Sequence, residues 1–367
     1  MKIAYMGVKG LPSKAGADRV VEAIVKRVSK LGYEVTVYCD FKNTPKDFQM
    51  GSIKLIIVPS IPGKYFRAPS LFIFSALHAL FFGKFDLVHL HNAEAGFILP
   101  ILRLKYKVIS TSHGSAYWRT KWGKIAKKIM SMMDKPFISF SNIATCVSIN
   151  EAKRLESVFQ KKVHYIPNGV GAEYAGDIPA ANKILKEKNI NNEKYFIFVA
   201  GRIEPTKGAH LAIKAINNMD TDEKLIMVGD TNHSRNYQKY LLEILSNKII
   251  SIDFIDKPET LYGLMKLAFA LIFPSTVEAM SMVLLEASML EVPIICSDIP
   301  ENKAIFGDLG IYFENDNEES LTKTLHWALD NPQKMTENSK KLKDHVHSNF
   351  SWDVIVNSYV HLYEELK

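Results

Sequence analysis

Short runs of apolar residues recur along the chain and alternate with longer stretches in which apolar positions return every three or four residues. An apolar run of about four to eight residues is typical of a buried strand, and the longer spacing is typical of an amphipathic helix. In the first half of the chain the predicted strands cover residues 2–6, 35–39, 53–58, 86–90, 108–112, 143–147 and 163–166. Regular alternation of strands and helices predicts βαβ units around a parallel sheet.

Residues 171–194 are polar and lack strand character, and after them the alternation resumes. The predicted strands of the second half cover residues 195–200, 225–228, 249–254, 271–273, 294–297 and 310–313. A chain of 367 residues is too long for one ordinary α/β core. We therefore predict an α/β protein with two Rossmann-like domains, residues 1–170 and residues 171–350.

Composition is that of a globular protein with an anionic partner. Charged residues make up 23% of the chain and no apolar run reaches the roughly 18 residues that span a bilayer. The first residues enter a strand without a signal-peptide pattern, so we expect a cytoplasmic protein. Cys39, Cys146 and Cys296 lie in or at the ends of apolar strands, which favours buried free thiols over a disulfide or a metal site. The net charge of +7 fits a nucleotide, a phospholipid surface or a nucleic acid, although no nucleic-acid-binding motif is found.

Two glutamates frame a short apolar helix within residues 273–298. The apolar runs on either side are predicted strands, so residues 281–290 must form the helix between them, with Ser281 as its N-cap. Glu278 then lies in the loop facing the helix N-terminus, and Glu286 lies inside the helix. Ligands of open α/β sheets bind outside the carboxyl ends of the strands, where these carboxylates could hold a sugar and a ribose diol. Taken alone, the two residues are also explained as a solvated loop charge and a helix-surface charge.

Other candidate residues follow other predicted strands. Arg202 and Lys207 lie between the first strand of the second domain and the next helix, a spacing at which both can converge on one diphosphate. His113 stands at the carboxyl end of a strand and is followed by glycine, which fits a ligand contact and a hydrogen-bonded core residue equally well. Gly16 ends a glycine-containing loop and fits either the close approach of a ligand or a tight turn.

Together these motifs resemble those of the retaining GT-B glycosyltransferases of family 4. The residues that match the family's E-x7-E signature are Phe273, Pro274, Ser275, Glu278, Ser281, Glu286 and Ala287. The loop with Arg202 and Lys207 resembles the family's G-R-x4-K-G loop, and His113 with Gly114 resembles its H-G motif. Gly16 stands where the first loop of the family usually has a glycine pair. The resemblance covers nearly the whole chain.

The resemblance implies a GT-B fold, with the active site in the cleft between the domains and helix 351–367 packed back on the first domain. It also implies transfer of a hexose from a UDP- or GDP-sugar to an acceptor hydroxyl, with retention at the anomeric carbon and without a metal or other cofactor. The implied catalytic residues are His113, Glu278, Arg202 and Lys207. The implied nucleotide-binding residues are Gly16, Arg202, Lys207, Ile255, Ser281, Met282 and Glu286.

Each implied residue has a physical task. Arg202 and Lys207 would take the place of a metal cation by stabilising negative charge on the leaving diphosphate. Glu286 would hold the ribose, while Glu278 and His113 would orient the donor sugar.

Two basic and aromatic segments bear on the acceptor. Residues 62–84 are dense in phenylalanine, with basic residues at the edges. Residues 106–135 are rich in lysine and place four apolar residues on one helical face: Trp122, Ile125, Ile129 and Met133. Such segments favour contact with an anionic membrane, here the inner face of the plasma membrane, while core packing beneath a solvated face explains them as well. Together with the family resemblance, the two segments favour a glycan or lipid-linked acceptor in cell-surface polysaccharide biosynthesis.

Two other classes of protein remain open. A sugar-nucleotide epimerase of the same fold would convert the donor without an acceptor. A non-catalytic interaction protein would bind a partner and turn over nothing, and the presence of Arg202, Lys207, Glu278 and Glu286 argues against it.

Overall fold

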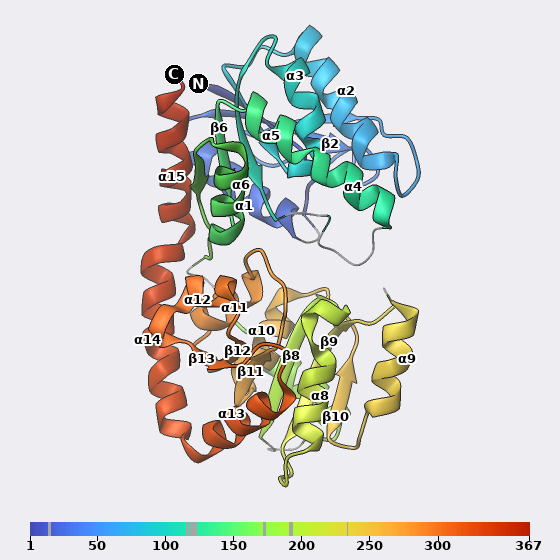
Figure 1. The fold of residues 1–367 in the computed structure, drawn as a ribbon, viewed down its shortest axis with the longest axis vertical. Helices are drawn as coiled ribbons and strands as arrows, with labels where there is room; N and C mark the ends of the chain where they lie inside the picture. The colour runs from blue at the N-terminus through green and yellow to red at the C-terminus, as the bar shows by residue number, and fades with distance from the viewer. Residues whose placement is uncertain (14–15, 115–116, 118–122, 172–173, 191–193, 233) are drawn as a thin grey trace. The chain divides into compact units, whose positions relative to one another are not determined.

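The chain forms two compact units, each built around one parallel sheet (Figure 1). The computed structural model describes residues 1–13, 16–114, 117, 123–171, 174–190, 194–232 and 234–367. The first unit comprises Met1–Gly169 and Trp352–Lys367, and the second comprises Val170–Ser351. Because strands and helices alternate through both units and all strand pairs are parallel, the predicted α/β class is confirmed.

The first unit contains a seven-stranded sheet in the order β3-β2-β1-β4-β5-β6-β7. Its strands are β1 (Lys2–Met6), β2 (Glu34–Asp40), β3 (Lys54–Val58), β4 (Leu87–His91), β5 (Lys107–Ser112), β6 (Ile143–Cys146) and β7 (Val163–Tyr165). Its helices are α1 (Ala17–Lys30), α2 (Arg67–Phe82), η1 (Ala93–Ile98), α3 (Leu99–Leu102), α4 (Lys124–Met132), α5 (Asp134–Phe140), α6 (Ile149–Phe159) and α15 (Trp352–Glu365). Successive strand residues face opposite sides of a sheet, so Ala4 and Met6 join the core under α2, α3, α5 and α6, and Tyr5 points toward α15.

The second unit contains a six-stranded sheet in the order β10-β9-β8-β11-β12-β13. Its strands are β8 (Tyr195–Arg202), β9 (Lys224–Asp230), β10 (Ile249–Ile252), β11 (Ala270–Phe273), β12 (Ile294–Ser297) and β13 (Ile311–Phe313). Its helices are α7 (Ile178–Glu187), η3 (Pro205–Lys207), α8 (Ala209–Asn217), α9 (Arg235–Ile244), α10 (Pro258–Leu267), α11 (Met282–Met289), α12 (Pro300–Phe306), η4 (Gly307–Leu309), α13 (Glu318–Asp330) and α14 (Pro332–Phe350). The core on one face of this sheet lies under α8, α9 and α13.

Serine side chains cap the N-termini of two helices, and one of them, Ser281, is the predicted N-cap. The Ser148 side chain accepts from the backbone N–H of Glu151 at 3.2 Å at the start of α6. The Ser281 side chain accepts from the backbone N–H of Leu284 at 3.4 Å at the start of α11. An N-cap satisfies one of the four N–H groups that a helix leaves without an internal partner.

The last helix belongs to the first unit. On α15 the Tyr363 hydroxyl lies 2.9 Å from the Tyr5 hydroxyl and 2.8 Å from Nδ1 of His89, and all three side chains are buried. A Cβ at Gly169 would lie 2.6 Å from Cδ2 of the Trp352 ring and closer still to its Cε3, so only glycine allows the start of α15 to pack this closely. Buried hydrogen bonds and close packing therefore fix α15 on the sheet of the first unit.

The cysteines are buried and free, as predicted. Burial raises the pKa of Cys39 to about 11 and that of Cys146 to about 12, so both stay protonated at neutral pH. None of the helices in the described part of the chain is long and apolar enough to cross a membrane.

Candidate active site

Four of the predicted site residues lie at or beyond the carboxyl ends of the adjacent strands β8 and β11. The strand numbers increase outward from this pair on both sides: β9 and β10 follow beside β8, and β12 and β13 follow beside β11. At such a switch point the following loops diverge to opposite faces of the sheet and leave a crevice at the carboxyl ends of the strands. Arg202 is the last residue of β8 and Lys207 lies in the segment after it, and the segment after β11 contains Glu278 and Ser281.

Gly208 holds the two loops together. Its φ is +70°, and a Cβ there would lie 2.8 Å from the carbonyl carbon of Pro274 and closer still to its oxygen. The backbone N–H of Thr276 donates to the Thr206 carbonyl at 2.9 Å across the same junction. Only glycine tolerates both this φ and this close approach of the Pro274 backbone. Steric exclusion of a side chain therefore explains the last glycine of the G-R-x4-K-G pattern.

The junction brings Lys207 and Glu278 together. Lys207 Nζ donates to Glu278 Oε1 at 2.6 Å, and the two side chains are 31% and 10% exposed. The sequence predicted separate tasks for these residues, and the structure places them in one ion pair. Since an ammonium has three donors, Lys207 can keep this bond while it donates to a phosphate oxygen.

Arg202 lies at the end of β8 in a looser pair. Its Nε is 3.6 Å from Glu204 Oε1, and its side chain is 42% exposed. Exposed ion pairs of this kind contribute little to stability. The guanidinium can therefore turn to an anionic ligand at small energetic cost.

Glu286 is 3% exposed, so it is not the helix-surface charge that its sequence position also allowed. It lies on α11, whose residues from Leu284 to Met289 are all buried and, apart from Glu286 and Ser288, apolar, and a buried carboxylate requires polar partners. Met282, at the first position of α11, is half-buried. Ile255 is half-buried beyond the end of β10, the edge strand that β9 separates from β8.

The other predicted site residues, His113 and Gly16, lie in the first unit. His113 follows β5 and is half-buried, and its Nε2 lies 2.9 Å from Nδ1 of His91 at the end of β4. The two rings are stacked, with centroids 5.2 Å apart. Gly16 is the N-cap of α1 with φ +59° and ψ −135°, a conformation that favours glycine.

His91, which the sequence analysis did not single out, contacts His113 through a ring nitrogen and by ring stacking. It is fully buried, and its Nε2 has no hydrogen-bond partner among the described residues. Neighbouring His89 bonds Tyr363 through Nδ1 and Thr111 Oγ1 through Nε2 at 2.7 Å. Burial lowers the pKa of His89 to about 3 and holds that of His91 well below its usual value, so both rings are neutral.

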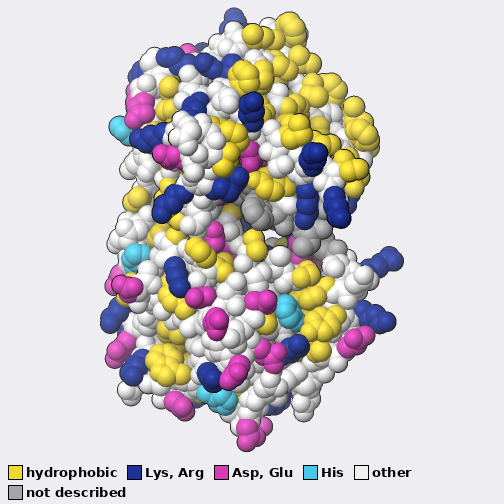
Figure 2. All heavy atoms as spheres, in the orientation of Figure 1, with side chains coloured by type: hydrophobic (Ala, Val, Ile, Leu, Met, Phe, Trp, Pro, Cys, Tyr) yellow, Lys and Arg dark blue, Asp and Glu magenta, His cyan; other side chains and the backbone are white. Residues whose placement is uncertain are grey.

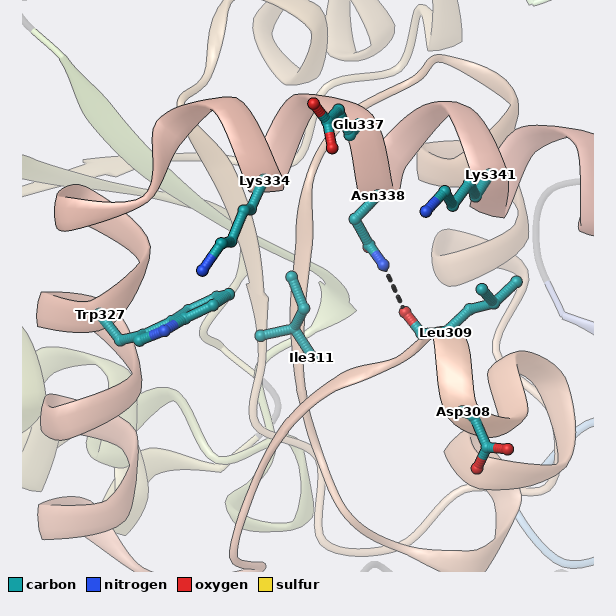
Figure 3. A pocket seen from close by; sticks show the side chains of 8 residues that line it. All are labelled: Asp308, Leu309, Ile311, Trp327, Lys334, Glu337, Asn338 and Lys341. Atoms are coloured by element: carbon teal, nitrogen blue, oxygen red, sulfur yellow. Dashed lines mark hydrogen bonds between the residues drawn. The ribbon is translucent and has the colours of Figure 1, made fainter.

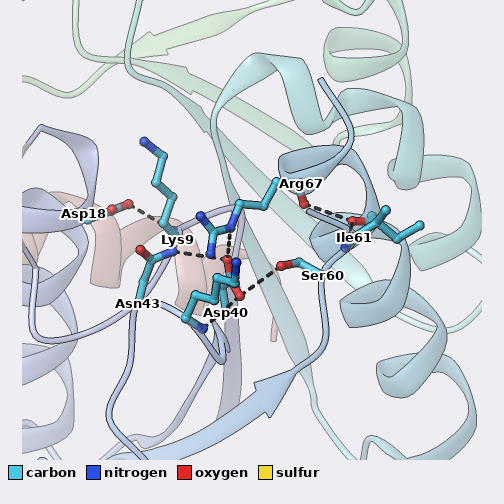
Figure 4. Close-up of polar contacts among 9 residues, drawn as sticks. Lys9, Asp18, Asp40, Asn43, Ser60, Ile61 and Arg67 are labelled. Atoms are coloured by element: carbon cyan, nitrogen blue, oxygen red, sulfur yellow. Dashed lines mark hydrogen bonds and ion pairs between the residues drawn. The ribbon is translucent and has the colours of Figure 1, made fainter. Parts of the chain in front are cut away.

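A second polar cluster at the carboxyl edge of the first sheet was missed in the sequence (Figure 4). Asp40 ends β2, is 1% exposed and accepts from the Ser60 hydroxyl at 3.0 Å, the Asn43 amide at 3.1 Å and Arg67 Nε at 2.8 Å. Arg67 is the first residue of α2. Asp40 therefore ties the loops after β2 and β3 to the start of α2. The only sign of this cluster in the sequence was a charged residue, Asp40, at the end of an apolar strand.

Two family models match this chain, one in each half. The model described as Glycosyltransferase Family 4 matches residues 15–174, and the model described as Glycosyl transferases group 1 matches residues 181–344. The chain belongs to the GT-B glycosyltransferases of family 4. The predicted family and the predicted enzyme class are thus confirmed.

Relatives and solved structures agree with this assignment. The glycosyltransferase is 25% identical over 320 residues to UDP-Gal:alpha-D-GlcNAc-diphosphoundecaprenol alpha-1,3-galactosyltransferase of Escherichia coli, covering 83% of this chain and 81% of the relative. Its fold is similar to sucrose-phosphate synthase of Thermosynechococcus elongatus, with a TM-score of 0.82, 19% identity and coverage of 100% of this chain and 98% of that one. It is also similar to Anabaena HepE in complex with UDP-glucose, with a TM-score of 0.78, 16% identity and full coverage of both chains. The predicted GT-B fold is confirmed.

One shallow pocket of the glycosyltransferase lies away from the candidate site residues (Figure 3). It has a volume of about 280 Å³ and lies beside β13 between α13 and α14. Lys334 stands over the Trp327 ring, and the Asn338 amide donates to the Leu309 carbonyl at 2.7 Å. These contacts join neighbouring helices, and none of the predicted site residues lines the pocket.

Proposed function

We propose that this glycosyltransferase moves a hexose from a UDP- or GDP-sugar, with retention at the anomeric carbon, to a glycan or lipid-linked acceptor in cell-surface polysaccharide biosynthesis. The observation that supports the proposal best is the Lys207–Glu278 pair beside Arg202 at the switch point of the second sheet. The E. coli relative is named for a UDP-sugar donor and a diphosphoundecaprenol acceptor, and the HepE structure contains UDP-glucose.

In this proposal the second unit binds the donor nucleotide. Arg202 and Lys207 donate to the diphosphate, whose negative charge grows as the bond to the sugar breaks, so their hydrogen bonds strengthen in the transition state. Glu278 holds Lys207 in position and leaves two of its donors for phosphate oxygens. This charge stabilisation is the task that the family resemblance implies for the two cations.

The nucleoside is held by residues around α11. Glu286 accepts from the ribose hydroxyls, and a phosphate oxygen lies at the first turn of α11, near Ser281 and Met282, where helix N–H groups have no partner within the helix. Ile255 contacts the base through its backbone.

In this proposal the first unit binds the acceptor. His113, oriented by His91, contacts the donor sugar, and Gly16 lets the ligand approach the backbone. The carboxyl edge of the sheet, where Asp40 fixes Arg67, is the part of the first unit that we assign to the acceptor. A lipid-linked acceptor would bring the enzyme to the cytoplasmic face of a membrane as a peripheral protein.

Calorimetric titration of UDP, GDP and NAD into the purified protein in EDTA tests the nucleotide site. We expect one nucleoside diphosphate to bind and Arg202→Ala to weaken it at least tenfold, because a hydrogen bond between charged groups contributes about 1.5–3 kcal/mol. Lys323→Ala is the matched control, since Lys323 is an exposed cation of α13 in the same unit. Failure of both diphosphates to bind would refute the donor site and favour a non-catalytic protein.

Retention is tested by the anomeric configuration of the product, read by NMR soon after mixing donor and acceptor. We expect the anomeric configuration of the donor in the product. An inverted product would refute retention, and a changed donor sugar in the absence of acceptor would identify an epimerase.

A further inference from the structure

The helix α4 exposes its apolar face. All nine of its residues are described and none of them is buried. Ile125, Ile129 and Met132 stand at the i, i+4 and i+7 positions, so they share one face, and they are 80%, 55% and 60% exposed. An amphipathic helix of a globular protein normally turns this face to the core. Ile125 and Ile129, two residues of the predicted apolar face, therefore do not pack in the core, while Met133 is half-buried and Trp122 lies outside the described residues.

The helix α2 has an exposed apolar stripe opposite its core face. Leu71, Phe72, Ala76 and Ala79 join the core of the first unit. Ile73, Leu77 and Phe81 follow one another at intervals of four residues on the outward side, and Phe81 is 70% exposed. Figure 1 draws α2 and α4 at the right-hand side of the first unit, and Figure 2 shows hydrophobic side chains gathered there with Lys and Arg beside them.

The sequence around both helices has charge of one sign. Residues 48–85, which contain α2, include four Lys or Arg and no Asp or Glu. Residues 95–133, which contain α4, include eight Lys or Arg and no Asp or Glu. Lys124, Lys127 and Lys128 flank the apolar face of α4. This combination of an apolar stripe and a lysine-rich margin is the pattern of a helix that lies in the interface of an anionic bilayer.

We propose that this surface docks the first unit on a bilayer of anionic phospholipids. We call it the α2–α4 surface and define it by the outward residues of both helices: Ile73, Leu77, Phe81, Phe82, Ile125, Ile129, Met132, Lys124, Lys127 and Lys128. Lysine is depleted from protein–protein interfaces, whereas long lysine side chains can extend their ammonium groups to lipid phosphates while their stems stay among apolar groups. The charge pattern therefore favours a lipid partner over a protein partner.

Docking deepens the proposed function, on which it rests for the lipid-linked acceptor. An acceptor whose lipid stays in the bilayer can be reached only by an enzyme at the bilayer surface. The start of α2 holds Arg67, the residue that Asp40 fixes at the carboxyl edge of the sheet. The same helix thus extends from the proposed acceptor edge along the α2–α4 surface.

Sedimentation with vesicles of pure phosphatidylcholine, or with a third of it replaced by phosphatidylglycerol, tests the proposal without any nucleotide. We expect binding to the anionic vesicles at least tenfold tighter than to the neutral ones. We expect Ile125→Ser with Ile129→Ser to weaken that binding at least tenfold. Val158→Ser with Leu242→Ser is the control, since these residues are 58% and 63% exposed on α6 and α9.

The lysines are tested separately from the apolar residues. Replacing Lys124, Lys127 and Lys128 by Gln should weaken binding to anionic vesicles by about a hundredfold at low salt and leave binding to neutral vesicles unchanged. The control is the Gln triple variant of three exposed lysines of α14: Lys334, Lys340 and Lys341.

Three outcomes would overturn docking. They are absence of vesicle binding, equal loss of binding in the control variants, and a stable dimer in sedimentation velocity that the isoleucine substitutions dissociate. Nucleotide calorimetry uses no lipid, so failure of the donor site and failure of docking give different results.

Discussion

Alanine at Gly208 should separate the two loops of the donor site. The residue has φ +70° and ψ 21°, where an L side chain costs about 1–2 kcal/mol. Its new Cβ would lie 2.8 Å from the Pro274 carbonyl carbon, against an optimal separation of about 3.5–4.0 Å, and overpacking of this kind costs about 1–3 kcal/mol. Relief of the overlap must move Lys207, one residue away, from Glu278. We therefore expect nucleoside diphosphate affinity to fall about 10- to 100-fold, the effect of losing one charged hydrogen bond.

Calorimetry checks this expectation, and Gly307→Ala is its control. Gly307 lies in the same unit with φ +52° and ψ −132°, so alanine is strained there as well, but its Cβ would meet no atom within 4 Å. Both variants should melt at lower temperature, and only Gly208→Ala should lose affinity. Wild-type affinity in Gly208→Ala, or equal loss in both variants, would refute the idea that this glycine aligns the loops.

Three further outcomes follow from single side chains. Lys207→Ala should lower kcat at least tenfold, which corresponds to a loss of about 1.4 kcal/mol of transition-state stabilisation. An unchanged kcat at saturating donor would mean that Lys207 is merely a solvated lysine. Glu286→Ala should weaken nucleotide binding about tenfold in calorimetry with the circular dichroism spectrum preserved, and equal affinity would remove its ribose role. Burial lowers the pKa of His89 from 6.5 to about 3, so between these values the unfolded state binds the extra proton. The free energy of unfolding should then fall as the pH drops below about 6.5, by up to ~1.4 kcal/mol per pH unit. The melting temperatures at pH 7 and pH 5 check this expectation, and equal melting temperatures would contradict the burial argument.

Much of the fold follows from local patterns in the sequence. Strands were predictable because each apolar run is bounded by polar or glycine residues, as in the run that became β8. The start of α11 was predictable because a serine at the N-cap satisfies a helix N–H group. The predicted strand ends were less accurate. The sequence predicted a strand over residues 249–254, but β10 ends at Ile252. An edge strand is partly exposed, so its apolar pattern marks its end only weakly.

The contacts inside the candidate site were beyond sequence reasoning. His91 and His113 are 22 residues apart, and Asp40 and Arg67 are 27 apart. Each pair meets because strand order and register place two loops at one sheet edge, and neither follows from local periodicity. Burial also decides function here: a histidine pattern alone does not say that His91 is fully enclosed and neutral.

The Lys207–Glu278 pair changes how substitutions at either residue must be interpreted. Removing Lys207 leaves Glu278, only 10% exposed, without its counter-charge, so the loss includes that penalty as well as the lost phosphate contact. Removing Glu278 frees the ammonium, which can bind a diphosphate more strongly and at the same time becomes less well positioned. The two residues act as a unit, and their single effects should not add. A double-mutant cycle on kcat and on nucleotide affinity separates the two contributions: strong coupling in both means that Glu278 acts by positioning Lys207, and coupling in affinity alone assigns Glu278 a separate task on the sugar.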